Sequence, residues 1–170
     1  MFNVKIIVIT SLLVCVSAFG SPKIGDKAVS FDFPELISAK SHIKMRDYND
    51  KVVLLNIWAS WCKGCKKEMP FFHKIGKKYK KNGLIVIAVN IDNKAKKANA
   101  FLKKLNEKIG EKAQITFAYD NKKVLPKAYG ASVVPFSLLI KNGKIVETYY
   151  GSFNKENSHS LLQNIKAAIK

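Results

Sequence analysis

Two near-continuous apolar runs, at residues 52–58 and 84–91, constrain the fold more than any other feature of the sequence. Strands that are apolar without alternation are typical of a parallel sheet covered on both faces. The segment between the runs, residues 62–81, is predicted to be one helix that bends at Pro70, because proline removes a helical hydrogen bond. This order of strand, helix and strand predicts an α/β fold.

The rest of the chain continues the alternation of strands and helices, without repeats or low-complexity segments. Further elements are expected at residues 29–34, 98–109, 115–119, 124–129, 136–141 and 144–150, and after residue 154. Asn142-Gly143 predicts a tight hairpin between the last two strands. Gly110 is expected to end the helix before it, and Asn154 to cap the last helix. A hairpin beside parallel strands gives a central mixed β-sheet flanked by helices.

Cys62 and Cys65 lie three residues apart, where the first apolar strand gives way to the helix. The unpaired N–H groups and positive dipole of a helix start favour an anion, so Cys62 is expected to ionise near neutral pH. Cys65, one turn along the same face, is close enough to displace Cys62 from a mixed disulfide. We predict a redox site in which Cys62 attacks and Cys65 resolves. Such a pair is also half of a zinc site, but no second pair completes four ligands.

The first twenty residues have the pattern of an export signal: a short basic start, an apolar stretch at 6–19, and small residues at its end. The apolar stretch has about fourteen residues, fewer than the roughly 18 to 20 that a membrane-spanning helix needs. We therefore expect residues 1–20 to direct export and to be cleaved near Ala18 or Gly20. An uncleaved membrane anchor is the alternative. Either outcome predicts a periplasmic or otherwise extracytoplasmic protein.

The cysteine count fits an exported chain with one redox pair. Cys15 is expected to leave with the signal. Residues 21–170, the predicted single domain, then keep only Cys62 and Cys65. Two cysteines provide no structural disulfide framework in an oxidising compartment, so this pair is available for exchange.

The formal net charge is +18, and every basic residue except Arg46 is a lysine. Nucleic-acid recognition relies on arginine forks and a clustered basic stripe, so we expect no nucleic-acid partner. A dispersed lysine surface indicates solvation, with steering toward acidic partners or an anionic membrane face as a weaker option. We expect a monomer.

The Trp-Cys-x-x-Cys-x-x-Glu-x-Pro string at 61–70 and the Val-Val-Pro-Phe segment at 133–136 resemble the thioredoxin superfamily, in particular its exported TlpA/ResA branch. The resemblance covers residues 23–170. It implies a thioredoxin-like fold with an N-terminal strand extension and an inserted helix around 93–110. It also implies a thiol-disulfide oxidoreductase without a cofactor or metal. Such proteins take electrons from a membrane thiol transporter and reduce specific client proteins, most commonly apocytochrome c during haem attachment.

Glu68 is the acid with the most unusual surroundings. Its helical neighbours at positions 64, 65, 71 and 72 are a glycine, a cysteine and two phenylalanines. An acid that faces thiols and aromatic rings has a raised pKa and is able to carry the proton of Cys65. A solvated surface acid is the alternative. Plain thioredoxins have a buried aspartate at the position of Asn56, and the resemblance implies that Glu68 takes over its work.

Pro135, taken alone, is a proline at the start of a strand. The resemblance implies a cis bond beside the disulfide and a Val134 backbone that binds an extended client segment. Trp61 is expected either to shield the disulfide and contact clients or to pack in the core, and Trp58 to pack in the core. The Lys63-Gly64 dipeptide departs from the x-Pro dipeptide that is frequent between the cysteines in this branch. The sequence therefore does not predict the redox potential.

Two other functions are open to a thioredoxin-like domain. A copper-binding chaperone of this fold typically separates its cysteines by three residues and adds a histidine before a late strand. Here the spacing is two residues, and no histidine lies near Pro135. A thiol peroxidase requires a lone cysteine beside a threonine and an arginine, and Arg46 lies outside such a motif. The remaining candidates for ligands or bases are expected to be surface or structural residues: His42, His73 and His159.

Overall fold

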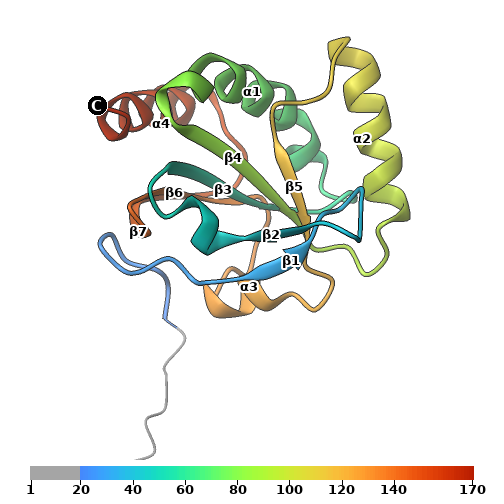
Figure 1. The fold of residues 1–170 in the computed structure, drawn as a ribbon, viewed down its shortest axis with the longest axis horizontal. Helices are drawn as coiled ribbons and strands as arrows, with labels where there is room; N and C mark the ends of the chain where they lie inside the picture. The colour runs from blue at the N-terminus through green and yellow to red at the C-terminus, as the bar shows by residue number, and fades with distance from the viewer. Residues whose placement is uncertain (1–19) are drawn as a thin grey trace, which may run out of the picture.

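The computed structural model describes residues 20–170, so the predicted export signal lies outside the described residues apart from Gly20. A five-stranded mixed sheet with the order β5-β4-β3-β6-β7 forms the centre (Figure 1). Its strands are β3 (Val52–Trp58), β4 (Leu84–Asn90), β5 (Thr116–Tyr119), β6 (Phe136–Lys141) and β7 (Lys144–Tyr150). The two apolar runs form β3 and β4, and every residue of β3 is buried. The predicted mixed sheet is therefore confirmed.

Strand direction brings the carboxyl ends of three strands to one edge of the sheet. β3, β4 and β5 run parallel, whereas β6 runs antiparallel to β3 and to β7. The β6–β7 hairpin turns at Asn142-Gly143, where both residues have positive φ, 52° and 69°. This two-residue turn is the predicted one, because its geometry favours asparagine followed by glycine.

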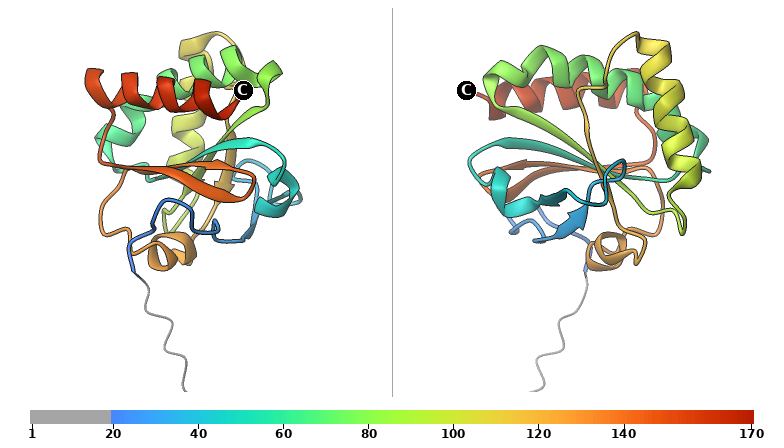
Figure 2. Two further views of the ribbon diagram at one scale, coloured as in Figure 1. Left: turned by 90° about the vertical axis from the view of Figure 1, so that its left-hand side faces the viewer. Right: turned by 45° about the vertical axis from the view of Figure 1, so that its right-hand side comes forward.

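Helices cover both faces of the sheet (Figures 1 and 2). α1 (Lys63–Tyr79) and α4 (Lys155–Ala168) lie on one face, and the short α3 (Val124–Ala128) lies on the other. α1 continues through Pro70 and is followed by a 3₁₀ turn at Lys80–Asn82. α2 (Lys96–Ile109), the expected inserted helix, packs beside α1 at the β5 side of the sheet.

The N-terminal extension is a second, two-stranded antiparallel sheet of β1 (Asp32–Pro34) and β2 (His42–Lys44), followed by a 3₁₀ turn at Met45–Tyr48. β1 is shorter than the predicted strand at 29–34. The reason is that the backbone before β1 bonds elsewhere: the Val29 N–H donates to the hydroxyl of Tyr129. An isolated bridge between Glu35 and Ala118 joins the extension to β5.

Trp58 is fully buried, as predicted, and anchors α2 to the sheet. Its ring centroid lies 5.5 Å from that of Phe101 on α2 and 6.1 Å from that of Phe117 on β5. The expected helix ends are also present, since Gly110 is left-handed and the Asn154 side chain accepts the Asn157 N–H. None of the helices described for residues 20–170 has the length and apolar character that crossing a membrane requires.

Candidate active site at the Cys62–Cys65 disulfide

Cys62 and Cys65 form a disulfide at the start of α1. Cys62 is the N-cap of the helix, and its sulfur accepts the backbone N–H of Cys65 at 3.1 Å. The same N–H and the helix dipole would stabilise a Cys62 thiolate after reduction. Cys62 is 8% exposed and Cys65 is fully buried, so Cys62 is the more accessible of the two residues. This difference fits the predicted roles of the two thiols.

The loop before β6 lies directly against the disulfide. The Val134–Pro135 peptide bond is cis, as the resemblance implies. The Cys62 sulfur lies 3.6 Å from the Val134 carbonyl oxygen. Pro135 is buried, whereas Val134 is half-buried. A backbone group therefore lies within reach of any segment that becomes bonded to Cys62.

Glu68 lies on the buried face of α1, one turn after Cys65, and only 5% of it is exposed. Burial raises its pKa to about 7, although hydrogen bonds from the Phe153 N–H and the Asn56 side chain oppose the shift. Asn56 Nδ2 donates to Oε1 at 3.1 Å, and the Phe153 N–H donates to Oε2 at 3.3 Å. The alternative of a solvated surface acid is wrong. A carboxyl with this pKa exchanges protons near neutral pH.

The hydrogen-bonded pair of Asn56 and Ser137 next to Glu68 was not identified from the sequence. Asn56 Nδ2 also donates to the Ser137 hydroxyl at 2.9 Å, because Asn56 on β3 and Ser137 on β6 lie opposite each other. Asn56 Oδ1 is buried without a hydrogen-bond partner. The available signal was the single polar residue within the apolar run at 52–58. A polar residue in a fully buried strand requires a polar partner.

Trp61 is 69% exposed, so the core alternative for this residue is wrong. The backbone just before it is held by Asp92, a residue that sequence reasoning missed. The Ser60 N–H donates to both carboxylate oxygens of Asp92, at 3.1 and 3.2 Å. Asp92 follows β4 and Ser60 follows β3, so the parallel strand ends bring them together. The Asp92 carboxylate thereby positions the loop that presents Trp61 and Cys62.

A side chain at Gly64 would require Ser152 to move. A Cβ at this position would overlap Ser152 Oγ, which lies on the loop between β7 and α4. This contact gives a physical reason for the departure from the x-Pro dipeptide of the branch.

Gly64→Ala should therefore destabilise the protein by about 1 kcal/mol, the lower end of the cost of overpacking, because the Ser152 hydroxyl has to turn away. Ser152→Gly should remove most of that cost when combined with Gly64→Ala, and urea unfolding of both single variants and the double variant measures the coupling. Additive effects of the two substitutions would contradict the steric explanation.

The three histidines either bond to residues away from the disulfide or are exposed to solvent. His73 is buried, and its Nδ1 accepts the Gln114 N–H at 3.1 Å. His42 Nδ1 bonds to the Asp32 carboxylate at 2.6 Å, and His159 is exposed on α4. Within residues 20–170, histidine, cysteine and acidic side chains form no group of three that is able to hold a metal ion.

The redoxin family matches residues 23–165 of this chain. The chain belongs to the redoxin family. Two relatives named thiol-disulfide oxidoreductase ResA come from Bacillus thuringiensis subsp. konkukian (strain 97-27) and Geobacillus thermodenitrificans (strain NG80-2). They are 33% and 34% identical to this redoxin, and the matches cover 84% of its chain and 79% and 78% of theirs.

Solved structures agree with these relatives. A crystal structure of a DsbE-type thiol:disulfide interchange protein from Chlorobium tepidum is 36% identical to this redoxin, with a TM-score of 0.78. The match covers 88% of this chain and 100% of that one. The redoxin thus has a thioredoxin-like fold and is a ResA-like thiol-disulfide oxidoreductase whose Cys62–Cys65 pair forms a disulfide.

Proposed function

We propose that this redoxin is an exported reductant that passes electrons from Cys62 and Cys65 to disulfides of specific client proteins. The buried Glu68 carboxyl, one turn from Cys65, is the observation that carries the proposal. The resemblance to the ResA branch favours apocytochrome c as the client and a membrane thiol protein as the electron donor. Residues 1–20 would direct export, as a cleaved signal or as an anchor that keeps the domain on the membrane.

The burial of Cys65 and the Glu68 carboxyl favour reduction of clients over their oxidation. A dithiol protein is a strong oxidant when its reduced form is stabilised, as by a thiolate-favouring site. The helix start and nearby lysines such as Lys63 favour a Cys62 thiolate, but the burial of Cys65 and an ionised Glu68 oppose negative charge on the pair. Ionisation then stabilises the reduced pair less, so the pair gives up its electrons more readily.

The reaction has two exchange steps. The Cys62 thiolate attacks one sulfur of the client disulfide, whose S–S bond breaks, and the second client sulfur leaves as a thiolate that takes a proton from solvent. Cys65 then loses its proton to Glu68 and attacks the Cys62 sulfur, which releases the first client sulfur. Glu68 returns the proton to this leaving thiolate. Two electrons have passed to the client, and the redoxin holds the disulfide between Cys62 and Cys65.

Three other residues would hold the client during these steps. The backbone of Val134, fixed by cis-Pro135, lies beside the Cys62 sulfur and is placed to bond an extended client segment. The exposed Trp61 ring, which lines the same depression as Val134, offers the client an apolar contact. A mixed disulfide would bury this ring.

Equilibration of the purified redoxin with reduced and oxidised glutathione tests the direction of electron transfer. We expect a reduction potential of roughly −220 mV or lower, in the range of reducing dithiol proteins. A potential near roughly −120 mV, as for strong oxidants, would contradict the proposal. Insulin reduction, copper content and peroxide consumption of the same sample separate a reductant from a copper chaperone and a peroxidase.

A further inference from the structure

The surface beside the disulfide has an apolar centre. Trp61 is 69% exposed and Val133 52%. A depression of about 650 Å³ lies between Trp61 and α3 and reaches Val134. Because the Val134 carbonyl oxygen lies 3.6 Å from the Cys62 sulfur, a client residue bonded to Cys62 lies at the rim of this depression.

Lysines surround this apolar centre. A second depression of about 460 Å³ adjoins Trp61 on the side of α2. Exposed lysines from three segments line the two depressions: Lys94, Lys96, Lys97, Lys123 and Lys127. On the α4 side of the disulfide, Lys63 and Lys67 line a third depression of about 480 Å³. Positive charge therefore lies on both sides of the sulfur that clients reach.

No exposed carboxylate of residues 20–170 lines any of these three depressions. Among residues 20–170, the acidic residues that line these three depressions are Glu68 and Asp92, and both are buried. The chain as a whole has 30 basic and 12 acidic residues, so the excess of positive over negative charge is greater on this surface than over the whole protein. The ion pairs described for residues 20–170 involve other cations, so these seven lysines have no carboxylate within 4.0 Å.

We infer that clients of this redoxin present an acidic segment with an apolar residue directly beside their oxidised cysteine. The inference rests on the proposed function and names the chemistry of its client. The apolar residue fills the depression between Trp61 and α3, and carboxylates one or two positions further reach the lysines, since an extended chain advances about 3.3 to 3.6 Å per residue. Opposite charges speed the encounter more than they strengthen the complex. An anionic bilayer is the other class of partner for lysines, but it does not fill a depression beside the reactive sulfur.

Three peptides test this inference. Each has one intramolecular disulfide with a valine beside one cysteine. The peptides differ only in the flanking residues, which are glutamate, glutamine or lysine. Reduced full-length redoxin is mixed with each peptide, and the second-order rate constant of exchange is measured. The acidic peptide should react about tenfold faster than the basic one at low ionic strength, and salt should reduce the ratio. The variant Lys96→Gln/Lys97→Gln/Lys127→Gln should lose most of the acidic preference.

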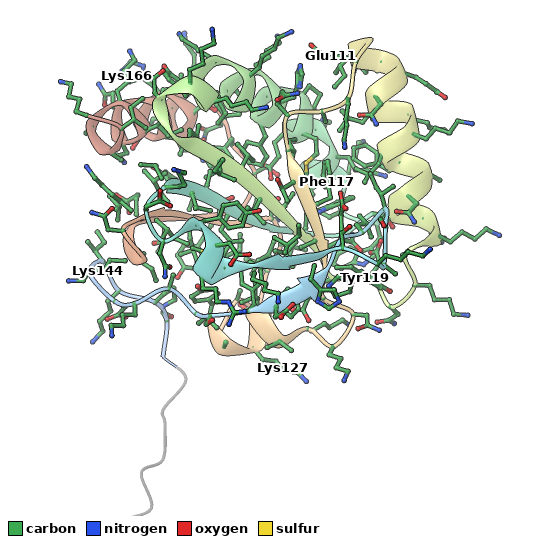
Figure 3. All side chains as sticks on the ribbon, in the orientation of Figure 1. Glu111, Phe117, Tyr119, Lys127, Lys144 and Lys166 are labelled. Atoms are coloured by element: carbon green, nitrogen blue, oxygen red, sulfur yellow. A yellow bond between two sulfur atoms is a disulfide. The ribbon has the colours of Figure 1, made fainter. Side chains whose placement is uncertain are left out.

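The matched control is Lys103→Gln/Lys108→Gln/Lys166→Gln, which removes the same charge from exposed positions outside the three depressions. Lys127 and Lys166 lie on opposite sides of the molecule (Figure 3). The control should keep the acidic preference, and an equal loss would assign the effect to net charge and overturn the inference. Equal rates for all three peptides, or a triple variant that loses only binding to anionic lipid vesicles, would also overturn it, while the proposed function would stand. Failure to reduce the glutamine peptide would overturn the proposed function and the inference together.

Discussion

Replacement of Cys65 by serine should turn the redoxin into a trap that keeps its client as a mixed disulfide. Cys62 remains at the N-cap of α1 and keeps the small exposure, 8%, that Cys65 lacks, so the first exchange step should still occur. A serine hydroxyl does not attack the mixed disulfide, so the second step stops and turnover falls to background. Non-reducing electrophoresis should show an adduct that dithiothreitol releases, and mass spectrometry of the adduct identifies the client.

Cys62→Ser is the matched control for this experiment. Its remaining thiol, Cys65, is fully buried, so a client disulfide has no access to it. This variant should form no adduct and should also lack turnover. Equal trapping by both variants, or by neither, would contradict the assignment of the attacking and resolving thiols.

Local sequence patterns were sufficient for the elements that carry the redox pair. The apolar run at 52–58 predicted a buried strand because a strand without polar alternation has no face for water, and all of β3 is buried. The burial of Glu68 was predicted in the same way, from its neighbours one helical turn away. Both inferences use periodicity within one element, which the sequence shows directly.

Contacts between distant segments had no comparable signal. The Phe153 N–H that donates to Glu68 lies 85 residues further along the chain, and Ser152 approaches Gly64 from the same loop. The positions of these contacts depend on how the β7–α4 loop crosses the start of α1. The resemblance supplied the cis bond at Pro135 but not the Asn56–Ser137 pair, because that pair depends on the register of β3 against β6.

Glu68→Gln should lower the apparent pKa of the cysteine pair and slow disulfide exchange. Above pH 7 the wild-type carboxylate, buried on α1 one helical turn from Cys65, opposes a thiolate, and glutamine removes this repulsion. Glutamine also removes the group that takes the Cys65 proton, so exchange with a client should slow by about 100-fold near neutral pH. Thiolate absorbance against pH and stopped-flow exchange rates measure the two effects on one sample.

The same substitution should change the pH dependence of stability. The pKa of Glu68 rises from 4.5 to about 7 on folding, so the folded protein binds more protons than the unfolded chain between these values. The contribution of Glu68 is therefore fully present below pH 4.5 and is lost as the pH rises through about 7. Relative to wild type, Glu68→Gln should gain stability over this window, by about 3 kcal/mol at most.

Urea unfolding of the oxidised protein at several pH values measures this gain, with Glu107→Gln as a control that removes an exposed acid on α2. Glu107→Gln should leave both the thiol titration and the window of stability close to wild type, because Glu107 is exposed and lies outside the depressions around the disulfide. A Glu68→Gln protein that matches wild type in thiol titration, exchange rate and unfolding would show that another group carries the Cys65 proton. A changed unfolding curve with unchanged exchange would instead restrict Glu68 to a structural role, because burial alone changes stability but does not affect proton transfer to Cys65.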